Sequence, residues 1–306
     1  MKNEKKATRQ SYGEKLEKLG EKYKNIVVLD ADLSSATKTI NFAKKFPERF
    51  FDMGIAESNM MATAAGMATC SKVPFASTFA VFATGRSYDQ IRNSICYPNL
   101  NVKICATHSG ITVGEDGATH QMLEDIALMR VLPNMKVLSP SDDIQTKWAI
   151  EEAYKQEGPV YVRLSRLATP IIYDENQDFE FGKMVKIGDG TDACVFATGD
   201  VVCEAIVAQE ELRKKGINIR VIYVHTIKPI DEEMIIKCSK ECKRLISIED
   251  HSIIGGLGSS IAEVLIEKYP TKLERIGMKD TFGKSGKAEE LLHYYGLDAR
   301  AIINQF

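Results

Sequence analysis

The sequence predicts an α/β protein of two domains, in which mainly parallel sheets are covered by helices on both faces. Three observations support this prediction. Short apolar runs alternate with helical patterns along most of the chain. The length of 306 residues is about twice that of a usual single domain. The composition, with 44% hydrophobic and 27% charged residues, is that of an ordinary globular protein.

The first part of the chain contains six apolar runs that predict strands. They lie at residues 25–32, 49–54, 73–78, 101–108, 135–140 and 160–165. The segments around them have the three- and four-residue apolar spacing of amphipathic helices. We expect these helices at residues 11–23, 57–71, 87–95, 121–132 and 142–156.

The alternation stops between Leu167 and Lys183, where polar and turn residues are dense. We therefore expect a first domain over residues 1–170, a linker over 171–185 and a second domain over 186–306. In the second domain we expect strands at 194–200, 217–224, 244–250 and 272–278, and helices at 204–216, 231–242 and 261–269.

The net charge and the short apolar runs of the sequence exclude several classes of function. The 40 basic and 42 acidic residues give a net charge of −2, so no basic field favours nucleic acid. No apolar run approaches the roughly 20 residues of a membrane helix, and the basic N-terminus is not followed by an apolar segment. We expect a cytoplasmic protein that binds neither nucleic acid nor membrane. The seven cysteines show no metal or redox spacing and are expected to be reduced.

Residues suited to chemistry follow four of the predicted strands of the first domain. Asp32 follows the first strand and Glu57 the second, Phe79 and Phe82 follow the third, and a polar glycine-rich loop over residues 108–120 follows the fourth. Ligands of open α/β sheets bind beyond the carboxyl ends of the strands. We therefore expect the functional site in the first domain.

Residue types alone leave two interpretations of these positions open. Glu57 could simply be an acid stabilised at a helix start, and Phe79 and Phe82 could be core residues. The loop is harder to explain by packing, because it holds His108, Asp116 and His120 and is long and polar.

The ordered motifs of the chain resemble those of the transketolase group of thiamine-diphosphate enzymes, over essentially the whole length. The motifs are DADLSSAT, MGIAESNM, STFAVF, THSGITVGEDGATHQ, MRVLPNM, VLSPSD and VRLSR. The resemblance is to the pyrimidine-binding and C-terminal domains. It implies that this chain is the C-terminal subunit of a split transketolase.

The family's diphosphate-binding domain, with its GDG motif and metal site, has no counterpart in this sequence. Gly188-Asp189-Gly190 spells GDG, but the following residues contain no paired asparagine, and we interpret the triplet as a turn. The resemblance implies an N-terminal partner subunit that carries the ligands for Mg²⁺ or Ca²⁺. It also implies self-association, giving a heterotetramer.

The resemblance implies roles for the cofactor-site residues. Glu57 would hydrogen-bond the pyrimidine ring of thiamine diphosphate, which needs a carboxyl whose pKa is raised by apolar surroundings. Phe82 would stack on that ring, and Phe79 would line the same pocket. A third aromatic residue of the family's pocket aligns with Gly85 here. Tyr88 or the partner chain would therefore have to form that side of the pocket.

The thiazolium and the substrate are assigned residues in the same way. Asp32 matches an acid near the thiazolium, where a negative charge favours the cation. His108 and His120 match catalytic, substrate-contacting histidines, and Asp116 matches the acid that reads a sugar hydroxyl. Arg9 and Arg166 match the arginines that hold the substrate phosphate. A further phosphate-contacting serine of the family aligns with Ala36, with Ser34, Ser35 and Thr37 beside it.

The implied reaction is the transfer of a two-carbon ketol unit from a ketose phosphate to an aldose phosphate in the non-oxidative pentose phosphate pathway. Three alternatives stay open. The chain could resemble a deoxyxylulose-phosphate synthase, a beta subunit of a 2-oxo acid dehydrogenase, or a transketolase-like partner subunit without catalytic activity.

Overall fold

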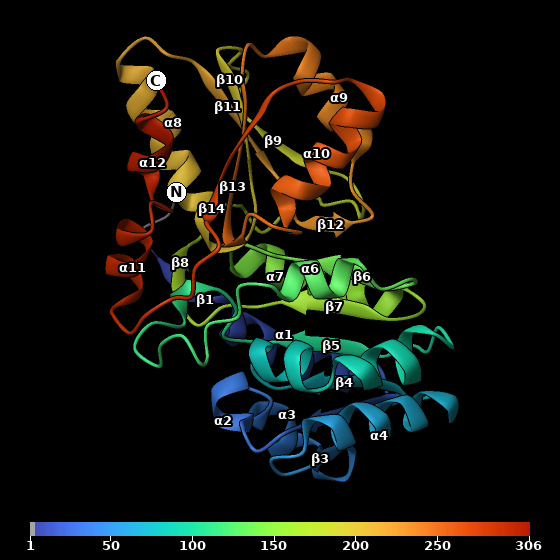
Figure 1. The fold of residues 1–306 in the computed structure, drawn as a ribbon. Coiled ribbons are helices and arrows are strands. Elements are labelled where there is room, and N and C mark those ends of the chain that lie inside the picture. The colour runs from blue at the N-terminus through green and yellow to red at the C-terminus, as the bar shows by residue number, and fades with distance from the viewer. Residues whose placement is uncertain (1–3) are drawn as a thin grey trace.

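A seven-stranded sheet forms the centre of the first domain in the computed structural model, which describes residues 4–306 (Figure 1). The first three residues of the predicted first domain lie outside the described part. The strand order is β12-β6-β7-β5-β4-β2-β3. Six of these strands come from the first domain and are parallel: β2 (Ile26–Asp30), β3 (Phe50–Asp52), β4 (Val73–Ser77), β5 (Lys103–Ala106), β6 (Lys136–Leu138) and β7 (Val160–Arg163).

Helices cover both faces of this sheet, which confirms the α/β prediction. They are α1 (Thr8–Lys22), α2 (Ser34–Thr37), α3 (Ile40–Lys45), α4 (Glu57–Thr69), α5 (Tyr88–Gln90), α6 (Asp125–Arg130) and α7 (Asp143–Lys155), with short 3-10 turns at Pro47–Arg49 and Ile111–Val113.

Two predicted helices of the first domain differ from the structure. The helix expected at residues 87–95 consists of α5 and a π-helix, η3 (Ile91–Cys96), and a second π-helix, η2 (Val81–Arg86), precedes it. The helix expected at residues 121–132 is only α6. Residues 121–124 are not helical, because Met122 pairs with Ser109 and its carbonyl accepts a hydrogen bond from the Gly110 nitrogen.

The segment between the domains is partly ordered by contacts with the N-terminal strand. β8 (Ala168–Pro170) pairs antiparallel with β1 (Lys5–Ala7). The Asp142 carboxylate caps α7 and also accepts hydrogen bonds from the nitrogens of Ile172 and Tyr173. These bonds tie the start of the linker to the first domain.

A five-stranded sheet forms the centre of the second domain, in the order β14-β13-β10-β11-β9. Its strands are β9 (Val185–Ile187), β10 (Ala193–Ala197), β11 (Ile219–Tyr223), β13 (Leu245–Ser252) and β14 (Leu273–Met278), and only β9 is antiparallel to its neighbour. The helices are α8 (Val202–Lys214), α9 (Glu232–Glu241), α10 (Leu257–Lys268), α11 (Ala288–Tyr294) and α12 (Ala299–Ile303), and a 3-10 turn lies at Gly199–Val201.

The GDG triplet at residues 188–190 lies in the loop that joins β9 and β10. Gly188 has φ +77°, and a Cβ at Gly190 would lie 2.2 Å from the carbonyl oxygen of Asn218. The backbone conformation and the close approach of a neighbouring strand therefore account for both glycines.

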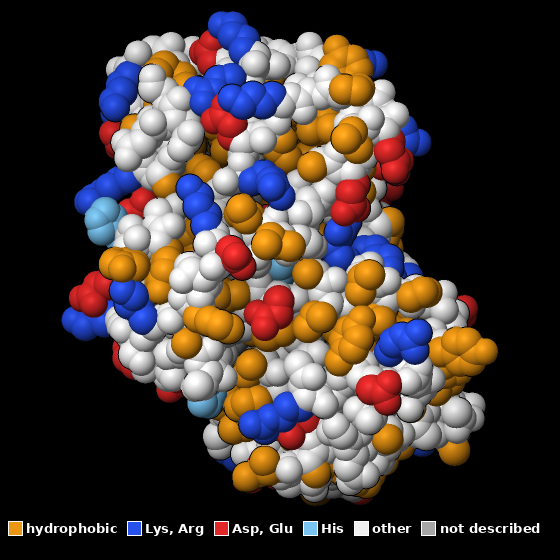
Figure 2. All heavy atoms as spheres, in the orientation of Figure 1, with side chains coloured by type: hydrophobic (Ala, Val, Ile, Leu, Met, Phe, Trp, Pro, Cys, Tyr) orange, Lys and Arg blue, Asp and Glu red, His pale blue; other side chains and the backbone are white. Residues whose placement is uncertain are grey.

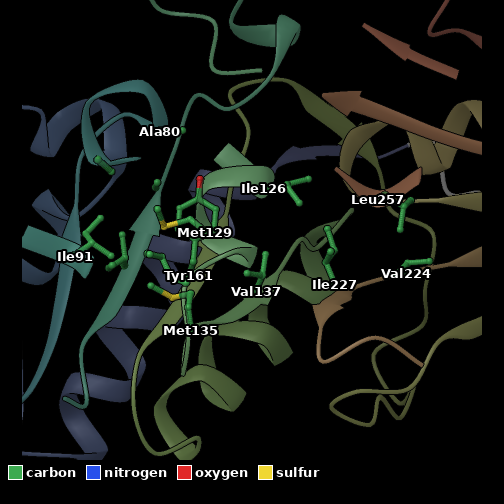
Figure 3. Close-up of a cluster of buried hydrophobic side chains, with 14 of the residues drawn as sticks. Ala80, Ile91, Ile126, Met129, Met135, Val137, Tyr161, Val224, Ile227 and Leu257 are labelled. Atoms are coloured by element: carbon green, nitrogen blue, oxygen red, sulfur yellow. The ribbon is translucent and has the colours of Figure 1, made fainter. Parts of the chain in front are cut away.

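The two domains share a sheet and a hydrophobic core. β12 (Thr226–Lys228), from the second domain, adds an antiparallel strand to the edge of the first-domain sheet beside β6. One cluster of buried side chains extends across the boundary, as Figure 3 shows for Met129, Val137, Val224, Ile227 and Leu257. The domains are therefore packed as one unit, which keeps second-domain residues close to the predicted site.

Neither a membrane helix nor a disulfide is found in the described residues. No helix over residues 4–306 is long and apolar enough to cross a membrane. All seven cysteines are free thiols, and among them only Cys70 is exposed.

Candidate thiamine-diphosphate and sugar-phosphate site

Four neighbouring strands bring the predicted site residues to one edge of the first-domain sheet. The strands β5, β4, β2 and β3 lie side by side in parallel, so their carboxyl ends share this edge. His108 follows β5, Phe79 and Phe82 follow β4, Asp32 follows β2, and Glu57 follows β3. Residues as far apart in the sequence as Asp32 and His108 thus lie at the same end of the sheet.

Glu57 is the first residue of α4, and its side chain is only 7% exposed. The carboxylate accepts a hydrogen bond of 3.0 Å from Nη1 of Arg86. The resemblance implied apolar surroundings for this acid, whereas the partner that the structure gives its carboxylate is a cation. A buried carboxylate needs such a partner or a bound ligand, because an unpaired charge is costly to bury.

Phe82 presents a half-buried ring to the same guanidinium. The Arg86 carbon Cζ lies 4.3 Å from the centre of the Phe82 ring. Phe79 is nearly parallel to Phe82, with ring centres 5.8 Å apart. Beside them, Gly85 is exposed, and a Cβ there would meet no atom within 4 Å. The position that aligns with the third family aromatic therefore has open space around its Cβ.

His108 is buried between aromatic and cationic groups. Its ring stacks on Phe79 with centres 3.8 Å apart, its Nδ1 lies 2.8 Å from Oγ1 of Thr107, and its Nε2 lies 3.5 Å from Nη1 of Arg9. Burial, reinforced by the charges of Arg9 and Arg166, lowers the pKa of His108 to about 3. The imidazole is therefore neutral near pH 7, with one nitrogen able to donate and the other able to accept a hydrogen bond.

His120 and Asp116 lie nearer to the surface of the same loop. The half-exposed His120 ring meets Phe82 edge to face, with centres 5.5 Å apart. The side chain of Asp116 is 44% exposed, and its carboxylate lies 3.9 Å from Nη1 of Arg166. His120 therefore belongs with the ring cluster, whereas Asp116 is open to solvent.

The two predicted phosphate-binding arginines lie within electrostatic reach of each other. Burial and the charge of Arg166 together lower the pKa of Arg9. Arg9 donates from Nη1 to the carbonyl oxygen of Ala36 at 2.9 Å, while its buried Nε has no partner. Arg166 donates to the carbonyl oxygen of Val113 and to Glu115. Neighbouring guanidinium groups with an unused donor are suited to an anion.

Asp32 and the neighbouring Asp30 have different environments. Asp32 is exposed and has φ +60°. Asp30 is buried, and it accepts hydrogen bonds from the nitrogen of Leu33 and from the hydroxyls of Thr37 and Thr39. Burial raises the pKa of Asp30 to about 6. Asp30 therefore holds the loop in place, and Asp32 is the acid left open to a ligand.

Sequence reasoning missed two contributors to the site. Arg86 carries no signal of its own apart from its position four residues after Phe82. Asp250, in the second domain, accepts hydrogen bonds from the nitrogen of Ile111 at 2.8 Å and from Oγ1 of Thr112 at 3.3 Å. A contact between residues about 140 positions apart leaves no trace in local sequence patterns.

Across residues 4–306, no three His, Cys, Asp or Glu side chains gather in a way that could hold a metal ion.

Comparison with known proteins accounts for both domains. Residues 4–171 match the family model "Transketolase, pyrimidine binding domain", and residues 182–302 match "Transketolase, C-terminal domain". The chain belongs to the transketolase family. A Methanocaldococcus jannaschii protein named "Putative transketolase C-terminal section" is 55% identical, over 98% of this chain and 95% of the relative.

Other relatives of this transketolase-family chain differ in length. A 6-deoxy-6-sulfo-D-fructose transketolase subunit, SqwH, from a Clostridium species is 40% identical over 96% of this chain and 92% of its own length. Human transketolase is 38% identical over 97% of this chain, which spans only 48% of the human protein. A solved structure described as "Split gene transketolase, inactive beta4 tetramer" is 48% identical, with a TM-score of 0.89 over 97% of this chain and 96% of that chain.

Proposed function

We propose that this transketolase-family chain is the C-terminal subunit of a split transketolase. The enzyme would transfer a two-carbon ketol unit from a ketose phosphate to an aldose phosphate in the non-oxidative pentose phosphate pathway. The observation that carries the proposal is that Glu57 and Phe82 contact one planar N–H donor, the guanidinium of Arg86. An aminopyrimidine ring needs the same two partners, a carboxyl group and a stacking face.

Thiamine diphosphate, when bound, supplies the nucleophilic carbon and the electron sink of the reaction. Glu57 would hold a proton in common with the pyrimidine ring nitrogen. Phe82 and Phe79 would orient the ring and exclude water from it. Asp32 would place a negative charge near the thiazolium.

The substrate would lie over the loop that begins at His108. Because His108 is neutral near pH 7, it can exchange hydrogen bonds with a sugar carbonyl or hydroxyl without a fixed charge. His120 would contact the substrate from the exposed side of the loop, and Asp116 would read a sugar hydroxyl. Arg9 and Arg166 would hold the substrate phosphate by charge-assisted hydrogen bonds.

The proposal includes an N-terminal partner subunit that supplies the diphosphate site and its Mg²⁺ or Ca²⁺ ligands, in a cytoplasmic heterotetramer. In support, this chain spans about half of human transketolase, and a similar solved chain is described as a tetramer. Figure 2 shows hydrophobic side chains on the surface of both domains, and Ile55, Tyr97 and Val131 are among the large exposed ones.

Reconstitution tests the function directly. This chain, its N-terminal partner, thiamine diphosphate and Mg²⁺ are mixed with xylulose 5-phosphate and ribose 5-phosphate, and glyceraldehyde 3-phosphate is measured. We expect product from the mixture and none from either subunit alone. Turnover with pyruvate as the only accepted donor would contradict ketol transfer. A parallel reaction with 6-deoxy-6-sulfo-fructose as donor tests the specificity named for the Clostridium relative.

Substitution of Glu57 tests the cofactor assignment within the same assay. Glu57→Ala should remove nearly all turnover while the subunits still co-elute in gel filtration. Glu57→Gln keeps the shape of the side chain but cannot share a proton in the same way, so it should also be nearly inactive. Normal turnover by either variant would exclude the role proposed for Glu57.

A further inference from the structure

Arg86 makes two contacts that converge on the proposed pyrimidine site. Its Nη1 donates to Oε1 of Glu57 at 3.0 Å, and its Cζ lies 4.3 Å from the centre of the Phe82 ring. The side chain of Arg86 is nevertheless 56% exposed. The guanidinium therefore contacts both the acid and the ring while it stays open to solvent.

The guanidinium resembles an aminopyrimidine in the properties that these two partners detect. Both groups are planar, carry N–H donors in the plane and offer a π face for stacking. A single pair of contacts, one on the Glu57 carboxylate and one on the Phe82 face, serves either group. The two groups therefore compete for the same partners.

The backbone of Arg86 is held, so the exchange is confined to its side chain. The Arg86 carbonyl oxygen accepts a hydrogen bond of 3.2 Å from Oγ of Ser58, the residue after Glu57. Gly85, just before Arg86, has open space around the position of a Cβ. A rotation of the Arg86 side chain can thus clear the site into solvent without movement of α4.

We infer that Arg86 occupies the pyrimidine site of the cofactor-free chain and must leave Glu57 and Phe82 before the cofactor binds. The inference rests on the proposed function. Occupation by Arg86 keeps the buried Glu57 carboxylate paired. It also lowers the apparent affinity for the cofactor, because the apparent dissociation constant is the intrinsic one divided by the fraction of chains in which the site is free. Arg86 is thereby a further cofactor-site residue, one that opposes binding.

Thiamine affinity tests this competition. Thiamine, which carries the pyrimidine ring without the diphosphate, is titrated into the full chain at millimolar concentration, and thiamine diphosphate into the assembly with the partner subunit. If Arg86 fills about nine-tenths of the sites, Arg86→Ala should tighten both dissociation constants about tenfold. Arg86→Lys, which keeps the charge but loses the flat N–H donor, should also tighten binding.

Arg92→Ala is the matched control, because the Arg92 side chain is exposed and, among the described residues, hydrogen-bonds only the side chain of its neighbour Asn93. It should leave both dissociation constants unchanged. Unchanged or weaker binding by Arg86→Ala, with a normal melting temperature, would overturn the inference.

A second measurement examines Arg86 itself in the absence of cofactor. In ¹⁵N spectra of arginine side chains, the Arg86 signal, assigned by its loss in Arg86→Lys, should move on Glu57→Gln substitution and again on thiamine addition. If the position of the Arg86 signal does not change on Glu57→Gln substitution, the guanidinium does not contact Glu57. If instead thiamine binds wild type, Glu57→Ala and Phe82→Ala equally, the proposed function fails, whatever the Arg86 signal does.

Discussion

The Asp250 carboxylate accepts a hydrogen bond of 2.8 Å from the backbone nitrogen of Ile111, and this bond joins the C-terminal domain to the loop that begins at His108. The second carboxylate oxygen accepts a hydrogen bond from the Thr112 hydroxyl. Gly110 lies so close that a Cβ there would be 2.0 Å from this oxygen. The C-terminal domain thus shapes a proposed substrate loop although it contributes none of the predicted site residues.

Asp250→Ala is expected to destabilise the chain and to reduce turnover. It leaves the Ile111 nitrogen buried without a partner, which costs about 1–3 kcal/mol of the free energy of unfolding. Asp250→Asn retains one acceptor oxygen and should lose less. Urea unfolding and reconstituted activity are the measurements, and Glu263→Ala, at an exposed ion pair between α6 and α10, is the control. Equal effects of Asp250→Ala and Glu263→Ala would contradict the anchoring role.

His108 should make the chain sensitive to acid. Its pKa is about 3 in the folded chain and about 6.5 in an unfolded one, so below pH 6.5 only the unfolded chain takes up this proton. The free energy of unfolding therefore falls as the pH drops from 6.5 towards 3. This histidine accounts for about 2 kcal/mol of that fall at pH 5.

His108→Gln should reduce the loss of stability between pH 7.5 and pH 5 by that amount, as measured by urea unfolding at the two pH values. His225 provides the comparison, because burial lowers its pKa to about 4 as well. His225→Gln should give a similar change in pH dependence, but only His108→Gln should remove turnover. An unaltered pH dependence in His108→Gln would show that the histidine is protonated alike in both states.

Arg9 and Arg166 should bind inorganic phosphate even without a sugar. Phosphate at about ten times its dissociation constant would add about 1.4 kcal/mol of stability and raise the melting temperature of the chain. Removal of both guanidinium groups in the double Ala variant should abolish that rise. Arg213→Ala, at an exposed position on α8, serves as the control and should keep it. A phosphate effect that survives in the double variant would place the anion elsewhere.

Two glycines should respond oppositely to the same substitution. Gly85 lies in η2 with free space around its Cβ position, so Gly85→Ala should be neutral or stabilise by up to about 1 kcal/mol. Gly110 has φ +74° and faces Asp250, so Gly110→Ala should destabilise by about 2 kcal/mol or more, because of backbone strain and overlap with the carboxylate. Thermal unfolding measures both. Similar melting temperatures for the two variants would contradict the described position of the loop.

Local pattern was enough to predict much of the fold. The strand around Val28 is a continuous apolar run, and α7 has apolar residues at helical spacing. The predicted positions of both agree with the structure to within a few residues. The helix expected at residues 121–132 was too long, because pairing between Met122 and Ser109 overrides helix propensity there. β12 is only three residues long and was not foreseen, since it is ordered by a sheet of the other domain.

By itself, the sequence determined the α/β class and pointed to Asp32, Glu57, Phe82 and His108 as candidate site residues, because strand ends and motif spacing are local properties. Only the tertiary structure decided what surrounds them. The pairing of Arg86 with Glu57 and the anchoring of Ile111 by Asp250 depend on distances between segments 29 and 139 residues apart. Such contacts arise from packing of distant elements, which no local pattern encodes.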